Sequence, residues 1–390
     1  MESKSKSILA LTMGTLSMMV CFMVWLSLSP MVDPILNNAG VQISEFQRSF
    51  LLATPILLGS IMRIPMGILA DKYGGKKIYI ALMLFLIIPV LMLPRVHSYG
   101  MLIFTALLLG MAGTSFAIGI SYVTGFFPPE KQGLVLGIAG VGNIGTAFSA
   151  FFLPRFIKTM SLVNIFYILV ALLVIFAVLM IFCPESKTNS EASMAKSLSV
   201  AKERDTWFLA LFYFLTFGMF MSMTNLLPTF MTKLFSNSLV EAGIWAAIFA
   251  VIGTLLRPVG GYLSDKIRPM TLLKYDFICL IIVAIVLGIF LKTQGIFLTI
   301  VVLIAILVGL GNGIIFKMVP FVSSGNTGAV TGFVGAMGGL GGYFPPIVLG
   351  VIKQSTGGYE IGIYLIAVVA LISLILLQKE YISGSRKIVK

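Results

Sequence analysis

The sequence predicts an all-α membrane protein with twelve transmembrane helices in two six-helix bundles. Hydrophobic residues make up 58% of the 390 residues and charged residues only 11%, which is far more apolar than a soluble domain. A helix needs roughly 20 mostly apolar residues to cross the hydrocarbon core, so a chain of this length with short loops has room for about a dozen spans. The apolar stretches are continuous, as at 281–291 and 361–377, so helices rather than a β-barrel are expected.

The apolar stretches divide into six plus six. The expected spans are residues 8–29, 46–70, 77–94, 99–125, 132–153, 162–183, 206–231, 240–263, 271–291, 295–317, 327–351 and 361–378. Between the sixth and the seventh lies a polar segment rich in Ser and in charges of both signs, which is typical of a linker. We therefore expect an N-terminal bundle over residues 1–183, a linker over 184–205 and a C-terminal bundle over 206–390.

The distribution of basic residues predicts the orientation. The loops on the side of both termini carry most of the Lys and Arg residues, for example at Lys72, Lys76 and Lys77, and the loops on the other side carry few, such as Arg48 and Arg95. By the positive-inside rule, both termini and the linker are cytoplasmic and the chain is a multi-pass protein of the cell membrane. The formal net charge of +13 thus reflects membrane topology and not binding to nucleic acid.

The sequence offers no enzyme site. Cys21, Cys183 and Cys279 lie in apolar stretches without the spacing of metal ligands, and the only histidine, His97, lies beside a polar turn. No arrangement typical of a nucleophile, a metal cluster or a nucleotide-binding loop is present. We expect a monomer without cofactor or metal.

An internal repeat links the two halves. The segment RIPMGILADK at 63–72, in the second span, matches RPVGGYLSDK at 257–266, in the eighth. Glycines of the fifth and eleventh spans correspond at nearly the same offset. Two six-span halves with the same orientation are typical of carriers that rock about a central site.

Two arginines carry the main functional signal. Arg63 and Arg257 each precede an aspartate, Asp71 and Asp265, by eight residues, which puts both about 12 Å inside the membrane. We expect them to be the only ionisable groups in the middle of a span apart from Lys317, which either lines the pathway or reaches the headgroups, and we expect no Asp or Glu at their depth. Buried guanidinium groups without a carboxylate predict an anionic ligand, and their planar fork suits a flat oxyanion. The alternative is that both side chains reach the interface or cap helix carbonyls.

Glycine-rich stripes mark the fifth and eleventh spans. Such stripes let helix backbones touch, and packing alone would explain them. Asn143 differs, because a buried amide one turn from Gly140 needs hydrogen-bond partners and can donate to an anion oxygen. The glycines that we expect at close helix contacts are Gly137, Gly140, Gly142, Gly332, Gly335 and Gly339.

The segment GILADKYGGKK at 67–77 resembles the signature of the major facilitator superfamily in the loop between the second and third spans, G-x-L-x-D-[RK]-x-G-x-[RK]-[RK]. A partial copy lies at 261–266. The resemblance implies the fold of that superfamily and makes Asp71 a gating residue, because this aspartate caps a helix end and tethers the two halves when the cytoplasmic side is closed. Gly67, Gly261 and Asp265 belong to the same two elements.

Within that superfamily the sequence resembles the nitrate/nitrite porters of the NarK and NarT type, which carry an arginine on each of the second and eighth spans and glycine-rich fifth and eleventh spans. Residues 213–218, YFLTFG, resemble their seventh span. The resemblance implies an anion clamped by Arg63 and Arg257, neutral donors at Asn143 and Tyr213, and a pocket closed by Phe116 and Phe217. Without the resemblance, Phe116 and Phe217 would be interpreted as ordinary core residues.

The expected activity is nitrate uptake and nitrite export by alternating access. Exchange is favoured, because an empty site would hold two like charges in a dry cavity and would cross the membrane at greater cost than a loaded one. The expected lack of a carboxylate or histidine at the midplane argues against a proton relay. Proton-coupled nitrate symport and a facilitator for another small anion are the alternatives.

Overall fold

The chain folds into long helices that run side by side. A computed structural model describes residues 2–127, 132–186, 188, 199–322 and 327–383. Twelve of the helical segments that it describes are long and apolar enough to cross a membrane, so the predicted fold class is confirmed. Of the loop residues on which the predicted orientation depends, Lys131, Lys187, Lys196, Arg386, Lys387 and Lys390 lie outside the described residues, as does Pro128.

The helices of the first half are α1 Glu2–Trp25, α2 Leu28–Ala39, α3 Glu45–Ile61, α4 Arg63–Tyr73, α5 Gly75–Met92, α6 Tyr99–Leu109, α7 Ser115–Thr124, α8 Gln132–Gly140, α9 Gly145–Phe156 and α10 Leu162–Ile181. Those of the second half are α12 Arg204–Phe235, α13 Leu239–Lys266, α14 Pro269–Ile289, α15 Gln294–Val322, α16 Thr327–Thr356 and α17 Glu360–Leu377. A short π-helix, η6 Gln378–Ile382, follows α17.

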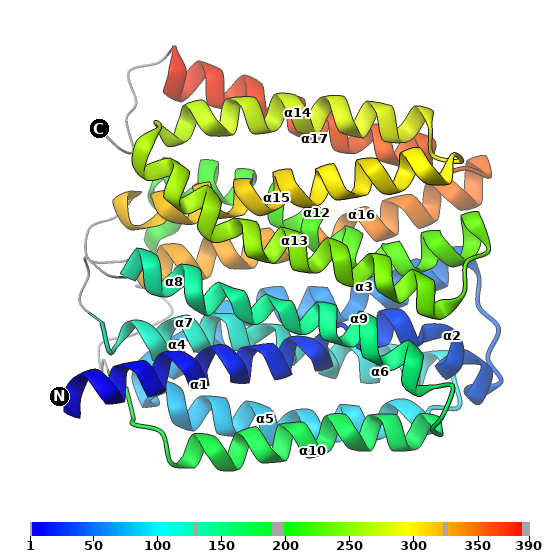
Figure 1. Ribbon diagram of the computed structural model, residues 1–390, viewed down its shortest axis with the longest axis horizontal. Coiled ribbons are helices and arrows are strands. Elements are labelled where there is room, and N and C mark those ends of the chain that lie inside the picture. Colours follow the sequence, from blue (N-terminus) through cyan, green and yellow to red (C-terminus); the bar gives the residue numbers. More distant parts are fainter. Residues whose placement is uncertain (1, 128–131, 187, 189–198, 323–326, 384–390) are drawn as a thin grey trace.

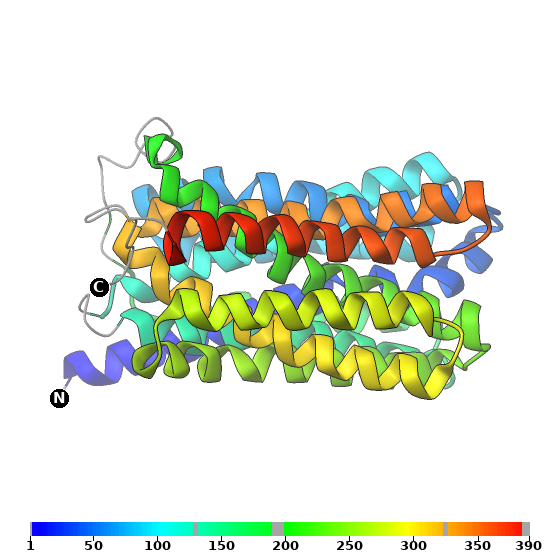
Figure 2. The same ribbon diagram turned by 90° about the horizontal axis from the view of Figure 1, so that it is seen from above.

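Both described ends of the chain lie at one end of the helix bundle, which we call the terminal face (Figure 1). The other end, where α2 joins α3, is the opposite face. Most N-terminal helices occupy the lower part of Figure 1 and the C-terminal helices the upper part, and Figure 2 gives the same bundle from above. The helices α3 and α16 meet at the seam, where Gly350 packs on Ser49. The division at residues 183 and 206 itself stays a prediction.

Apolar side chains cover the outside of the bundle. Ile175 of α10 and Ile375 of α17 are 51% and 55% exposed, and Ile282 and Ile289 of α14 are similarly open. In water such a surface would be an aggregation liability, whereas a bilayer solvates it. The exposed residues therefore agree with the lipid contact that the composition predicts.

Several predicted spans are broken helices. The first is longer than the expected 8–29 and consists of α1 and α2. The second breaks at Met62, immediately before Arg63, close to Pro65, which lacks a backbone N–H. The fifth contains a short 3₁₀ segment, η4 Val141–Ile144, in its glycine-rich stretch. Such interruptions inside helices often accompany functional sites.

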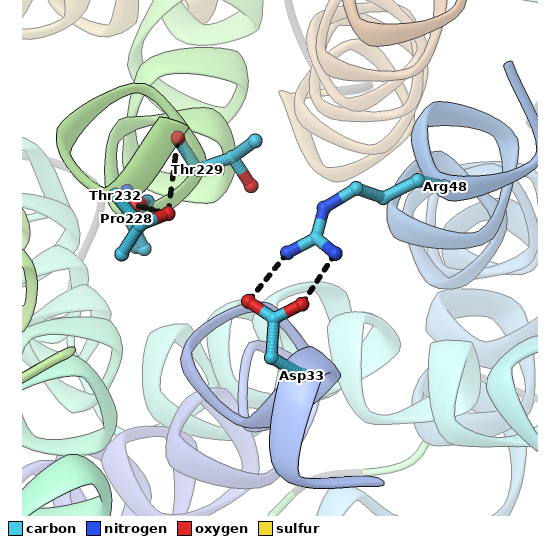
Figure 3. A network of polar contacts seen from close by, with 5 residues as sticks. All are labelled: Asp33, Arg48, Pro228, Thr229 and Thr232. Carbon is cyan, nitrogen blue, oxygen red and sulfur yellow. Dashed lines mark hydrogen bonds and ion pairs between the residues drawn. The ribbon is translucent and has the colours of Figure 1, made fainter. Parts of the chain in front are cut away.

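A partly buried ion pair lies near the opposite face. Arg48 donates from Nη1 and Nη2 to the two carboxylate oxygens of Asp33, at 2.6 and 2.9 Å, and Figure 3 shows Thr229 and Thr232 of α12 in the same region. The expectation that Arg48 is a loop residue was wrong, because it lies in the first turn of α3 and is only 6% exposed. Its charge is neutralised within the N-terminal half.

Polar contacts also join the two halves near this face. Ser29 of α2 donates to the carbonyl of Asn225 in α12 at 2.5 Å, and the Asn225 amide donates to the carbonyl of Leu52 in α3 at 2.7 Å. The described part of the chain has one further side-chain hydrogen bond between the halves, from Arg63 to Gly335. The halves are thus held together from the depth of Arg63 to the opposite face.

Candidate anion-binding site

Arg63 begins α4 at the break in the second span and is fully buried. Its Nε donates to the carbonyl of Gly113 at 3.2 Å, and its Nη1 donates to the carbonyl of Gly335 at 2.5 Å. Its Nη2 has no hydrogen-bond partner. Capping of carbonyls, the alternative to anion binding, therefore occurs in part, but carbonyls leave the positive charge uncompensated and one donor unused.

Arg257 occupies the matching position in α13 and is 8% exposed. Its Nε and Nη2 have no hydrogen-bond partner. The ring of Phe217 lies close to both guanidinium groups, with its centroid 5.3 Å from Cζ of Arg63 and 5.1 Å from Cζ of Arg257. The two repeat-related arginines thus converge on one aromatic ring from the two halves of the chain, within the range of cation–π attraction.

Aromatic side chains enclose the guanidinium groups. Tyr213 stacks on Phe217 one turn along α12, with ring centroids 4.8 Å apart and planes at 6°. Phe116 lies 5.1 Å from Cζ of Arg63. The Tyr213 hydroxyl lies close enough to both arginines to interact with their charges. It has no hydrogen-bond partner, so it is a further unused donor.

Asn143 lies in η4 and is fully buried, and neither its amide nitrogen nor its amide oxygen has a partner. One turn earlier, a methyl group added to Gly140 would lie 4.0 Å from Nη1 of Arg257. A methyl group on Gly335 would lie 3.9 Å from Nη1 of Arg63. Both glycines therefore lie beside the guanidinium groups, although a methyl group at either position would make only an ordinary contact with them.

The site brings together donors that water does not reach. A buried donor without a partner costs about 1–3 kcal/mol, and more when it is charged. A small oxyanion between the two arginines would satisfy several of these donors and supply the missing negative charge. The unpaired donors and the uncompensated charge therefore suit a small anion better than a cation or an apolar molecule.

Comparisons with known proteins identify the family. The profile of the Major Facilitator Superfamily matches residues 13–327. This chain belongs to the major facilitator superfamily. A "Nitrite extrusion protein" of Bacillus subtilis (strain 168) is 36% identical over 95% of this chain and 94% of its own length, and a "Probable nitrate transporter NarT" of Staphylococcus epidermidis is 38% identical over 96% and 97%. The chain is a transporter related to nitrate and nitrite transporters, not an enzyme, as the sequence predicts.

Solved structures of the superfamily share the fold. A bacterial homologue of the human lysosomal transporter Spinster, in an inward-facing and occupied conformation, has a TM-score of 0.72 at 16% identity and covers 94% of this chain and 95% of its own. The human organic anion transporter MFSD10 has a TM-score of 0.70 at 14% identity, with coverage of 96% and 99%.

The two aspartates for which the resemblance predicts a gating role, Asp71 and Asp265, lie near the terminal face. Asp71 accepts a hydrogen bond from Ser121 of α7, within its own half. Asp265 pairs with Lys317 of α15 at 2.5 Å. Lys317 thus forms an ion pair with the aspartate of the second repeat, and the two predicted roles for it, at the pathway or at the headgroups, both stay open. No described side-chain hydrogen bond joins the halves through either aspartate in this conformation.

The glycines predicted at helix contacts differ in how closely they are packed. Gly142 packs on Met18 of α1, and Gly339 packs on Ser60 of α3. A methyl group on Gly67 would meet Ala117 at 3.6 Å, an ordinary contact. Methyl groups on Gly140 and Gly335 would likewise make only ordinary contacts, at 4.0 Å from Arg257 and 3.4 Å from Phe116. Methyl groups on Gly137, Gly261 and Gly332 would meet no atom within 4 Å, so close packing has no support there in this conformation.

Sequence reasoning missed several residues at the site. Asn312 of α15 is 1% exposed and its amide has no partner. It lies one helical turn before Phe316, whose ring contacts Phe116 and Tyr213, so it shares the face of α15 that looks toward the arginines. Trp25 and Phe220 also lie against the guanidinium groups, Trp25 at 5.5 Å from Arg63 and Phe220 at 5.3 Å from Arg257.

The expectation that Arg63, Arg257 and Lys317 are the only ionisable groups in the middle of a span was wrong. So was the expectation that no carboxylate lies near the depth of the arginines. Asp276 lies within α14, seven residues beyond its first residue Pro269, and is 6% exposed. It forms no ion pair with either arginine. The anion site thus keeps its uncompensated charge, but the argument against a proton relay is lost.

Proposed function

We propose that this transporter carries nitrate and nitrite by alternating access, with its two halves moving about one anion held between Arg63 and Arg257. The observation that carries the proposal is the convergence of unused donors on this point: Nη2 of Arg63, Nε and Nη2 of Arg257, and the Tyr213 hydroxyl. Asn143 and Asn312 supply amide donors. Phe116 and Phe217 exclude water and thereby strengthen the charged contacts. The names of the relatives favour nitrate and nitrite over other small anions.

Exchange is the mode that we propose when no proton gradient is present. Without the anion, both guanidinium charges lie near one ring in a dry site, and carrying this uncompensated charge through the closed intermediate costs free energy. A bound anion removes one unit of that charge. The loaded carrier should therefore reorient faster than the empty one, which couples entry of one anion to exit of another.

The orientation follows from the loop charges. With the terminal face in the cytoplasm, a cell that reduces nitrate to nitrite inside would take up nitrate and export nitrite through a single site. We propose this direction, and a monomer as the transporting unit, since each chain contains both arginines.

The test is counterflow in proteoliposomes at equal internal and external pH. Vesicles are loaded with nitrite, nitrate or sulfate, and the entry of labelled nitrate is measured. Nitrite and nitrate inside should accelerate the initial rate by about tenfold or more over sulfate, because a barrier difference of about 1.4 kcal/mol already gives that factor. Formate-loaded vesicles test another small anion.

Equal nitrate entry into all vesicles would overturn exchange. Acceleration by formate but not by nitrite would overturn the choice of substrate. Protein-free vesicles and vesicles with Arg257→Ala supply the background.

A further inference from the structure

Asp276 is a carboxylate that the anion site does not use. It lies in α14, about 10 Å along the helix from its start at the terminal face, counting about 1.5 Å per residue. Neither of its oxygens has a hydrogen-bond partner, and the side chain is buried. Intramembrane carboxylates are costly and usually functional.

The carboxyl group lies where three helices of the C-terminal half meet. A methyl group on Gly311 of α15 would lie 2.8 Å from Oδ2 of Asp276 and 2.8 Å from Cγ2 of Thr216 in α12. The Thr216 hydroxyl donates to the carbonyl of Phe212 at 3.1 Å, so it does not satisfy Asp276. Glycine at 311 leaves the space that the carboxyl group occupies.

No described cation neutralises this carboxylate. The charged and titratable groups on the neighbouring elements are paired with other groups, belong to the anion site, or have no contact with Asp276 in the described structure. Those with other partners are Lys317 of α15, paired with Asp265; Glu360 of α17, paired with Lys292; and Glu380 of η6, paired with Arg204. The hydroxyl of Tyr381 in η6 donates to Asp205, and its backbone carbonyl accepts from Arg268. The others are Lys274, Tyr275 and Cys279 of α14, Tyr213 of α12, Tyr364 of α17, which packs against Gly288, and Lys379 of η6.

An ionised carboxylate in such a place is strongly disfavoured, and a buried acid without a partner usually takes up a proton instead. We propose that Asp276 is a proton-binding site, protonated in this conformation and ionised when movement of the helices admits water to it. The proton binds as H⁺ to the carboxylate and leaves as H⁺ to water, so no other reactant is required.

The helices around Asp276 also build the anion site. Thr216 directly precedes Phe217 in α12. In α15, Gly311 precedes Asn312, and Gly313 packs on the backbone carbonyl of Arg257. A shift of α12 or α15 against α14 would therefore change both the anion site and the access of water to Asp276.

The charges suggest what the proton does. A carrier with an anion bound and Asp276 neutral has one net positive charge in these groups, counting Arg63 and Arg257. A carrier with no anion and Asp276 ionised has the same net charge. Release of the proton together with the anion would thus lower the cost of returning empty, and would convert exchange into net uptake of an anion with a proton. This inference rests on the proposed anion transport.

The test compares the wild type with Asp276→Asn, which resembles the protonated side chain in shape, and with Glu360→Gln as a carboxylate control. Two rates are measured in proteoliposomes. The first is nitrate–nitrite counterflow at equal pH, and the second is net nitrate entry into sulfate-loaded vesicles under an inward proton gradient. Asp276→Asn should keep counterflow within about threefold of the wild type and lose proton-driven entry by about tenfold or more, since it cannot offset the buried charge of the empty site. Glu360→Gln should keep both.

Proton-driven entry that persists in Asp276→Asn, or that is absent from the wild type while counterflow works, would overturn the proton site alone. Loss of counterflow in the wild type would instead overturn the anion transport on which it rests. A sodium gradient at equal pH that drives entry through Asp276 would show that the site takes a metal cation and not a proton. Should Asp276→Asn fail to fold, Asp276→Glu is expected to restore proton-driven entry, and its failure with intact counterflow counts against the proposal.

Discussion

At the scale of the residue, the anion site depends on donors that no protein group satisfies. Arg63 commits two of its donors to carbonyls of Gly113 and Gly335, which fixes the guanidinium group while leaving Nη2 free. Tyr213 is fixed differently, by stacking on Phe217. Donors that are already rigid and correctly oriented lose less conformational entropy when a ligand binds.

The Tyr213 hydroxyl should therefore contribute to affinity without being essential. Tyr213→Phe keeps the stacked ring and removes one neutral hydrogen bond, worth about 0.5–1.5 kcal/mol, so nitrate should bind about 2- to 12-fold more weakly. Isothermal titration of the purified protein measures this change. Tyr275→Phe, at a 61% exposed position of α14, is the matched control, and an equal loss in both variants would remove Tyr213 from the site.

The two arginines were predictable from the sequence because charges inside apolar spans are rare and because the pair repeats. Asn312 and Asp276 were not. Asp276 lies close to the start of its span, between Tyr275 and Phe277, where a carboxylate can also reach the headgroups. Only the packed structure shows whether the carboxylate at this position reaches the headgroups or is buried between helices: Tyr275 is 61% exposed and Asp276 is 6% exposed. Likewise, nothing in a chain with 30 phenylalanines marks Phe220 as a neighbour of Arg257.

At the scale of the element, small residues set how closely the helices approach. Gly218 of α12 faces Gly341 of α16, and a methyl group on Gly218 would lie 2.5–2.6 Å from the Gly341 backbone. Backbone cannot rotate away as a side chain can. This contact lies one residue beyond Phe217, whose ring lies against both arginines.

Gly218→Ala should therefore separate α12 from α16 and lower stability by about 1–3 kcal/mol, the usual cost of overpacking. The same change at Gly261, which meets no atom within 4 Å, should be neutral or stabilising by up to about 1 kcal/mol, because Ala is the better helix former. Melting temperatures in detergent compare the two. An unchanged melting temperature for Gly218→Ala would contradict the close contact.

Element boundaries were predicted less well than element number. Continuous apolar runs identify twelve spans, but hydropathy averaged over a whole span does not register the breaks at Met62 or within residues 141–144. Pro65 and the clustered glycines were the available signals. Both breaks lie beside predicted ligands of the anion, Arg63 and Asn143, where an irregular backbone helps to aim a side chain into the site.

At the scale of the whole molecule, the two halves meet firmly on one side of the anion site. Asn225 links α12 to α2 and α3, through Ser29 and Leu52. On the terminal face, Asp71 and Asp265 bond within their own halves. Alternating access toward the opposite face would have to break the Asn225 bonds, while the aspartates become available to form new contacts between the halves.

The loaded site would itself join the halves, since Arg63 comes from the first and Arg257 from the second. An anion between them replaces repulsion with two attractive contacts, and so favours the closed intermediate that a carrier must pass through. This links the charge of two residues to the motion of the whole transporter.

The most direct test of the clamp is nitrate binding to the purified protein by isothermal titration. It compares the wild type with Arg63→Lys, Arg257→Lys and the control Arg155→Lys, in the last turn of α9 and outside the proposed site. We predict a single nitrate per chain in the wild type and in the control. Each of the first two variants should bind at least about tenfold more weakly, because an ammonium group keeps the charge but loses the planar fork. Wild-type affinity in Arg63→Lys or Arg257→Lys, with melting temperatures that show a folded protein, would contradict the clamp of one anion between the two halves.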